Sequence, residues 1–469
     1  MTNQNTKTLS HYFIKGEISK RFYDTLAMLI GFVSSYFVIS SLSVFHFGLY
    51  QLLLSFLSIM TSLSLGFIDG AVMVEMRLYL ESKKINLAKR IFWENTTIKL
   101  IIAGILAAGV FFGSNIIAGH YGEDIGLFIK LISILIIIDA AQTSEKIFFK
   151  SIVSFIHWSF PAIKEVVKLC AILVFLFFGN LTILNVLIAH IIGEFASLFL
   201  VTIFSFIKQY RKLFRDMKIS NDFLILRLIK LYGLWGLLKY GASRISKNSM
   251  PWLIKFFINT EAVAFYSLAI NLIAMIGNLM PSAGFGPVFL LNIGDKKKLG
   301  FVFKQSIKYI FWLGIIFMIF GFIFVPPIIG YIFPKYTQSF PIFNIMLLAL
   351  PLYGVYDILK SVLSVLREYK ILTMRIVNET LVVPLCSFLF LPIFGIIGSG
   401  MVYVSIYLER SIFFYSRLVK NNPEFKIKFI DVFKFNSEDK DFILKVINQF
   451  VLMSKSSLVS IKSFITRRQ

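Results

Sequence analysis

Several apolar stretches of the chain are longer than about 18 residues, the length that lets an α-helix cross a bilayer. No other feature of the sequence constrains the fold as strongly. Of the 469 residues, 57% are hydrophobic and only 16% are charged, whereas a soluble protein of this length needs far more charged surface. The sequence therefore predicts an all-α, polytopic membrane protein.

We expect about twelve membrane-spanning helices. Their predicted ranges are 23–46, 49–73, 98–118, 125–145, 161–178, 181–207, 237–258, 261–290, 306–329, 340–366, 371–391 and 395–418. Many of these ranges hold Gly, Ser, Asn or a charged residue, which is typical of helices that pack around a polar interior. We therefore expect the bundle to enclose polar space, as a transporter does.

Lysine and arginine residues are distributed unevenly between the predicted connections. Connections 75–97, 208–230 and 292–305 are basic, and the alternate connections hold only Lys335. Because basic loops tend to stay in the cytoplasm, both termini are predicted to be cytoplasmic. The outer connections are too short to form a domain that could carry a catalytic site.

Two pairs of landmarks indicate an internal repeat. Tyr50 of Gly48-Leu49-Tyr50 and Tyr266 of Ala264-Phe265-Tyr266 are 216 positions apart, and so are Gly179 and Gly395, each of which follows a Phe. A shared offset favours two parallel six-span repeats. The predicted units are a first lobe at 1–207, a cytoplasmic connection at 208–236, a second lobe at 237–420 and a cytoplasmic amphipathic tail at 421–469.

The predicted span 237–258 holds three cations on one helical stripe. At 100° per residue, Arg244, Lys247 and Lys255 share a face, and a cation within the bilayer costs at least about 2.5–3.5 kcal/mol on insertion scales. Such residues usually face an internal cavity. We interpret them as a substrate-binding stripe for an anionic group, and pairing with buried carboxylates is the alternative.

Five carboxylates also fall within predicted spans. They are Asp139, Glu194, Asp357, Glu379 and Glu409. Each could bind a coupling H⁺ or Na⁺ or form a structural ion pair, and the sequence leaves both interpretations open. Asp69 is expected to be a solvated helix-end residue, and Lys164 and Lys168 are expected to extend toward the lipid headgroups.

The sequence lacks the motifs that are typical of several classes of enzyme. The sequence has no phosphate-binding glycine loop, no zinc-ligand spacing and no nucleophile elbow, so we predict no catalytic residue, no metal site and no cofactor other than a coupling ion. The net charge of +23 lies mostly between apolar segments, where it meets anionic membrane lipids rather than nucleic acid. The sequence thus favours transport over catalysis.

Four short segments carry a resemblance to a known family. They are Gly48-Leu49-Tyr50, Leu65-Gly66, Glu261 to Ala269 (EAVAFYSLA) and Leu391 to Gly398 (LPIFGIIG). In this order and spacing, over about residues 12 to 420, the chain resembles the polysaccharide-transport branch of the multidrug/oligosaccharidyl-lipid/polysaccharide exporter (MOP) superfamily. The match is best to Wzx-type flippases for O-antigen or capsule units. The chain departs from the family pattern at Ala264, where Gly is common, and at Pro251-Trp252, where many members have an acidic–arginine pair.

The resemblance implies two six-helix lobes in a V around a cavity that opens alternately to either side. It also implies that undecaprenyl-diphosphate oligosaccharide is moved to the outer leaflet of a bacterial inner membrane, next to the polysaccharide polymerase machinery. Two alternatives remain open. One is a cation-coupled drug or metabolite exporter of the same superfamily, and the other is a membrane glycan polymerase or glycosyltransferase.

Overall fold

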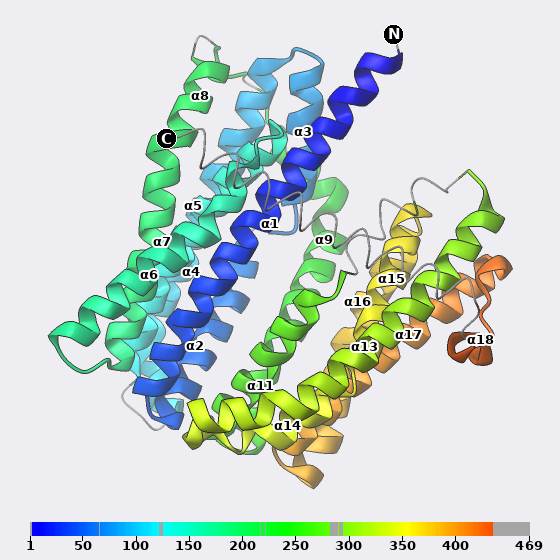
Figure 1. Ribbon diagram of the computed structural model, residues 1–469. Helices are drawn as coiled ribbons and strands as arrows, with labels where there is room; N and C mark the ends of the chain where they lie inside the picture. Colours follow the sequence, from blue (N-terminus) through cyan, green and yellow to red (C-terminus); the bar gives the residue numbers. More distant parts are fainter. Residues whose placement is uncertain are drawn as a thin grey trace, which may run out of the picture.

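The computed structural model describes residues 2–64, 66–121, 125–215, 217–220, 222–281, 289 and 294–434, and it contains no strand in these ranges. The side chains of 2–19, 21, 120–121, 231–239, 242, 247, 369 and 429 lie outside this description. The helices are α1 (Thr2–Ser41), α2 (Val44–Ser62), α3 (Asp69–Glu81), α4 (Ile85–Tyr121), α5 (Gly126–Ser151), α6 (Ser159–Phe178), α7 (Ile183–Val201), α8 (Ile207–Phe214), α9 (Ile225–Asn248), α10 (Met250–Phe257), α11 (Thr260–Leu279), α13 (Lys296–Ile332), α14 (Ser339–Leu347), α15 (Leu350–Val365), α16 (Tyr369–Phe394), α17 (Ile397–Asn421) and α18 (Phe429–Phe433) (Figure 1). Short helical turns lie at Phe155–Trp158, Thr202–Phe206, Pro334–Tyr336 and Pro423–Phe425.

The described helices confirm an all-α polytopic membrane protein. Within the described residues, eight helices are long and apolar enough to cross a membrane, or nine if α14 and α15, bent by 48°, form one span. Helices also occupy the other three predicted ranges, as α6, α9–α10 and α17. These helices are shorter or more polar than the other eight. For example, α6 holds three charged residues, Lys164, Glu165 and Lys168.

Besides 340–366, which is bent between α14 and α15, the predicted spans 49–73 and 237–258 are interrupted where the sequence was expected to continue a helix. The range 49–73 is split because α2 ends at Ser62 and α3 begins at Asp69. The range 237–258 is split because α9 ends at Asn248 and α10 begins at Met250, with Pro251 in its first turn. Proline has no backbone N–H to donate to the carbonyl four residues earlier, and at this break Ser55 Oγ donates to the Asn248 carbonyl at 2.9 Å.

The helices form two groups (Figure 1). In one group α4 packs on α5, and α6 packs on α7 and α1; in the other α13 packs on α15, and α16 packs on α17. The groups meet where α2 contacts α11 and where α9 contacts both α2 and α16. Figure 1 shows them close together near α2, α11 and α14 and farther apart toward α8 and α15.

The first part of the predicted tail folds back on α13. Trp312 Nε1 donates to the Val432 carbonyl at 2.9 Å, and Phe425 is fully buried against Phe303, with ring centroids 5.3 Å apart. Residues 435–469, which carry the predicted amphipathic helix, lie outside the described part of the structure.

The two groups approach each other closely at Gly48 of α2. A Cβ atom at this position would lie 2.1 Å from the Thr260 carbonyl oxygen and 3.3 Å from the Ala264 nitrogen. Gly48 and Ala264 are the equivalent positions of the two predicted repeats. The two landmarks that led to the predicted repeat therefore lie against each other, at Gly48 and Ala264.

Gly48→Ala is expected to destabilise the folded protein by about 1–3 kcal/mol, because the new methyl group meets backbone that has to move. Gly104→Ala in α4 is the matched control, since no atom lies within 4 Å of its ideal Cβ. It should be neutral or stabilising by up to about 1 kcal/mol. Thermal unfolding of the purified variants in detergent measures the difference. Equal stability of the two variants would contradict the close packing of α2 on α11.

Candidate functional site

A cavity of about 830 Å³ lies between the first helix group and α9. Its walls come from α2, α3, α4, α5, α6, α7 and α9. Its lining includes eight charged side chains, namely Asp69, Lys99, Asp139, Lys146, Lys150, Lys164, Glu194 and Arg244. Such a set within a membrane protein makes this cavity the candidate functional site, because isolated charges are expensive to hold in the bilayer.

The cavity carries an excess of positive charge. Among the described residues its lining has five cations and three carboxylates, which gives them a formal charge of +2 when His190 is neutral. Two of the carboxylates are in ion pairs, Glu194 with Lys164 at 2.8 Å and Asp69 with Lys99. Three cations, Lys146, Lys150 and Arg244, therefore remain around the third carboxylate, Asp139.

The third carboxylate is placed differently from the other two. Asp139 lines the cavity from α5 and makes no ion pair within 4 Å with any described residue. Four positions of α5, Asp139, Thr143, Lys146 and Lys150, all line the cavity. Their spacing of four, three and four residues puts them on one face of the helix.

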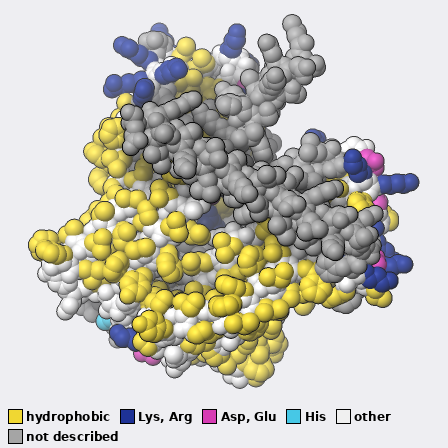
Figure 2. Space-filling model, viewed as in Figure 1, with side chains coloured by type: hydrophobic (Ala, Val, Ile, Leu, Met, Phe, Trp, Pro, Cys, Tyr) yellow, Lys and Arg dark blue, Asp and Glu magenta, His cyan; other side chains and the backbone are white. Residues whose placement is uncertain are grey.

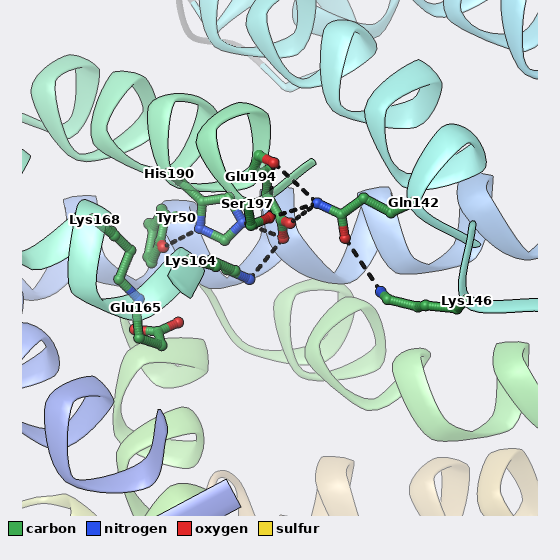
Figure 3. A network of polar contacts seen from close by, with 9 residues as sticks. All are labelled: Tyr50, Gln142, Lys146, Lys164, Glu165, Lys168, His190, Glu194 and Ser197. Carbon is green, nitrogen blue, oxygen red and sulfur yellow. Dashed lines mark hydrogen bonds and ion pairs between the residues drawn. The ribbon is translucent and has the colours of Figure 1, made fainter. Parts of the chain in front are cut away.

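A polar network joins the cavity wall to the interior of the first group (Figure 3). Gln142 Nε2 donates to Glu194 Oε2 at 2.8 Å and to Ser197 Oγ at 2.9 Å, while Lys146 Nζ donates to Gln142 Oε1 at 3.2 Å. Glu194 is thus shared between Lys164 and an amide that also contacts Lys146. The network orients Lys146 at the cavity.

The same network extends to a buried histidine. His190 Nδ1 lies 3.2 Å from the Tyr50 hydroxyl, and its Nε2 lies 3.7 Å from Glu194 Oε1. Both side chains are buried. Tyr50 belongs to the first repeat landmark, so this landmark reaches the polar network as well as the contact with α11.

The expectation that Lys164 and Lys168 extend to the headgroups is wrong. Lys164 pairs with Glu194, and Lys168 pairs with Glu165 of its own helix (Figure 3). Their side chains are only 23% and 12% exposed. The carboxylates hold both amines inside the bundle, because pairing there offsets the loss of hydration.

The expectation for Asp69 is also incomplete. Asp69 begins α3, as expected of a helix-end residue, but its carboxylate pairs with Lys99 of α4 and is only 19% exposed. Lys99 is almost fully buried, with 1% of its side chain exposed. A buried ammonium needs a counter-charge, and Asp69 supplies it.

The predicted cationic stripe is divided by the break between α9 and α10. Arg244 lines the cavity from α9, and its Nη2 donates to the Tyr240 hydroxyl at 3.3 Å. The Tyr240 ring lies where a Cβ of Gly66 would be, within 2.5 Å, so only glycine fits there without moving the ring. The Lys247 side chain lies outside the described residues, and Lys255, on α10, is not among the lining residues.

Of the other predicted carboxylates, Glu194 lines the cavity, and Asp357, Glu379 and Glu409 do not. Asp357 is half-buried on α15, and Glu409 lies on α17. Glu379 pairs with Arg375 at 3.0 Å and Arg410 at 2.5 Å, which favours a structural ion pair over ion coupling. Arg375 also donates to the Tyr356 hydroxyl at 2.6 Å, so this second cluster ties α15, α16 and α17 together.

Sequence reasoning missed Lys99, Gln142, Lys146 and Lys150 as site residues. Lys146 and Lys150 were assigned to a connection because the fourth span was ended at residue 145, whereas α5 continues to Ser151. The helical spacing from Asp139 to Lys150 is the signal that identifies them. No sequence signal marks Gln142, because its role depends on where α7 places Glu194.

Comparison with known proteins finds similarity in structure and not in sequence. No family model matches the chain, and no curated protein matches it. Lipid II flippase MurJ, in an inward closed conformation, superposes with a TM-score of 0.70 at 14% identity, covering 96% of this chain and 100% of MurJ. An inward-facing multidrug resistance MATE family transporter of the MOP superfamily superposes with a TM-score of 0.68 at 12% identity, covering 85% of this chain and 96% of that transporter.

A third solved structure is a MOP superfamily transporter from Pyrococcus furiosus, described as having a binding pocket of reverse polarity that suggests a different function. It superposes with a TM-score of 0.52 at 12% identity, covering 90% of this chain and 96% of that transporter. At such low identities these likenesses establish the fold alone. The chain has the multi-helix membrane fold of MOP superfamily transporters.

Proposed function

We propose that this protein is a flippase that moves a lipid-linked oligosaccharide, joined through a diphosphate to undecaprenol, from the cytoplasmic to the outer leaflet of a bacterial inner membrane. The observation that carries the proposal is the net positive charge of a large cavity inside a MOP-type fold. A diphosphate with its sugars is too polar to enter hydrocarbon. A cationic cavity replaces the hydration that the diphosphate loses.

The cavity cations suit a diphosphate by chemistry and by placement. Arg244 can direct two parallel N–H donors at phosphate oxygens, and Lys146 and Lys150 add mobile ammonium groups. Asp139, which lines the same cavity, limits the positive charge when the cavity is empty. The volume of about 830 Å³ is in the upper part of the range of roughly 300–1,000 Å³ usual for small-molecule sites, which leaves room for sugars next to the diphosphate.

In this proposal α2 and α11 close the outer end while the cavity is open to the cytoplasm, and the two helix groups then move to expose it on the other side. The basic connections support cytoplasmic termini. A coupling H⁺ or Na⁺ would bind a cavity carboxylate, Asp139 or Glu194. The product would be supplied to polysaccharide polymerase machinery at the outer face for O-antigen or capsule synthesis.

A cation-coupled exporter is the second candidate, because a MATE family transporter superposes almost as well as MurJ. The positive charge of the cavity suits an exporter of organic cations less well than it suits a flippase of an anionic lipid. An organic cation would enter a cavity with a formal charge of +2, and like charges at short range repel. We therefore favour an anionic substrate.

Deletion of the gene in its host is expected to abolish the surface glycan and to make complete oligosaccharide-lipid accumulate at the cytoplasmic face. Lipid-linked intermediates probed separately at each face of membrane vesicles measure this. Collapsing the H⁺ and Na⁺ gradients one at a time then identifies the coupling ion. Normal surface glycan with reduced resistance to small organic cations would establish the exporter, and single units that reach the surface without polymerising would establish a polymerase.

A further inference from the structure

A second hollow, of about 280 Å³, lies at the end of α8 and is lined by Arg211, Lys212, Leu213, Arg215 and Met217. It is separate from the central cavity and shares no lining residue with it. All three of its cations are exposed, and none makes an ion pair within 4 Å with a described residue. Figure 2 shows Lys and Arg side chains gathered at this end of the molecule.

The C-terminal end of α8 would normally repel an anion, because its free carbonyl groups carry partial negative charge. Here Lys89 of α4 binds one of them, at Phe214, and one carbonyl just beyond the helix, at Met217. Its Nζ donates to the Phe214 carbonyl at 3.1 Å and to the Met217 carbonyl at 2.7 Å. The two carbonyls are thereby satisfied, and a fourth positive charge is fixed behind the three exposed cations.

The position of the hollow relative to the bilayer follows from the helix that carries it. The helical run Ile183–Phe214 is 32 residues long, whereas about 20 residues cross the hydrocarbon core, so its last turns extend past the core. Trp93 Nε1 donates to the Tyr210 hydroxyl at 2.6 Å, and Trp93 is 43% exposed. Exposed Trp and Tyr side chains concentrate at the headgroup level of membranes.

Apolar side chains are exposed beside the cations. Phe204 lies seven residues before Arg211 on the helical run that leads to the hollow and is 73% exposed, and Met217, in the lining of the hollow, is 39% exposed. An exposed phenylalanine on the part of this helical run nearer the membrane, followed by exposed arginine and lysine, suits a ligand that has a negative head and a hydrocarbon tail. A soluble phosphate compound would make no use of the apolar part.

We propose that the hollow binds the headgroup phosphate of an anionic phospholipid, with Arg211 and Arg215 on the phosphate oxygens and the acyl chains along Phe204. The site goes beyond the proposed flippase activity and does not depend on which substrate is carried. It fixes the end of α8 at the bilayer surface on the face inferred to be cytoplasmic, where anionic lipids give the membrane its negative surface potential.

The experiment uses the purified full-length protein in detergent, titrated with brominated phosphatidylglycerol. Bromine quenches nearby tryptophan, and the Trp93 signal is the part lost in Trp93→Phe. Wild type should bind brominated phosphatidylglycerol at least tenfold more tightly than brominated phosphatidylcholine. The triple variant R211Q/K212Q/R215Q should lose at least tenfold in affinity, since each cation near an anionic lipid contributes about fivefold.

The matched control is K296Q/K297Q/K298Q, which removes the same charge from three exposed lysines at the start of α13. It should retain wild-type affinity within about twofold. Arg215→Gln alone, with an expected loss of about fivefold, replaces the triple variant if that variant does not fold. If both triple variants lost the same affinity for brominated phosphatidylglycerol, the lipid would be held by general charge attraction and the proposed site would be wrong. If inorganic phosphate displaced the brominated lipid, and phosphatidylglycerol bound no more tightly than phosphatidylcholine, the ligand of the hollow would be free phosphate and not a phospholipid.

Discussion

Glu379→Ala is expected to destabilise the folded protein by about 3–5 kcal/mol, because it leaves two buried guanidinium groups without a counter-charge. The Glu379 side chain is 5% exposed, and those of Arg375 and Arg410 are 8% and 11% exposed. Removing one member of such a cluster exposes the full cost of burying the others. Unfolding of the purified variant by heat or by denaturing detergent measures the loss.

The chain offers a matched control in Glu81→Ala. Arg77–Glu81 has the same spacing of four residues as Arg375–Glu379 and a comparable distance of 2.7 Å, but its side chains are 43% and 57% exposed. An exposed pair contributes roughly 0–1 kcal/mol. If Glu379→Ala were as stable as Glu81→Ala, the cluster could not be what ties α15, α16 and α17 together.

Arg244→Ala is expected to lower the initial rate of transport of the diphosphate-linked lipid by about ten- to a hundredfold, since hydrogen bonds to a charged group contribute about 1.5–3 kcal/mol. Arg244→Lys keeps the positive charge but loses the pair of parallel N–H donors. Its transport rate should therefore lie between those of the wild type and Arg244→Ala. The measurement is transport into liposomes by equal amounts of correctly inserted protein.

Lys335→Ala is the control for a lost charge alone. Lys335 is exposed on the short connection between α13 and α14, away from the cavity lining, and its removal should change the rate by less than about twofold. Wild-type transport by correctly inserted Arg244→Ala would disprove the diphosphate site. The proposed lipid site at α8 would be unaffected by that result.

Much of the fold followed from the sequence because the bilayer restricts the possible structures. A spanning segment has to satisfy its backbone internally, so long apolar stretches become helices. The exact positions at which a helix ends were harder to predict, because they depend on a single turn of the chain. The residues after Ser62 were assigned to a helix because they are apolar, yet the chain turns there, where Gly66 makes room for Tyr240.

The candidate site was predicted only in part. Arg244, Asp139 and Glu194 were found because a charge within an apolar stretch is conspicuous by itself. Lys164 was interpreted from its own helix, and its partner Glu194 lies on the next one. Pairings between helices depend on the rotation and depth of both, which the sequence of one helix does not contain. Whether Arg244, Lys247 and Lys255 bind substrate stays a prediction.

The charges of α6 have a consequence for how the protein is made. A charged residue at the centre of a membrane-spanning helix costs about 2.5–3.5 kcal/mol on insertion scales, and α6 holds three charged residues in its first ten positions. Glu165 and Lys168 neutralise each other within the helix, but the partner of Lys164 is on α7, which the ribosome synthesises later. We therefore expect α6 to settle in the membrane only after α7 has emerged, so that the two enter as a hairpin. In this half of the protein, a later segment completes the insertion of an earlier one.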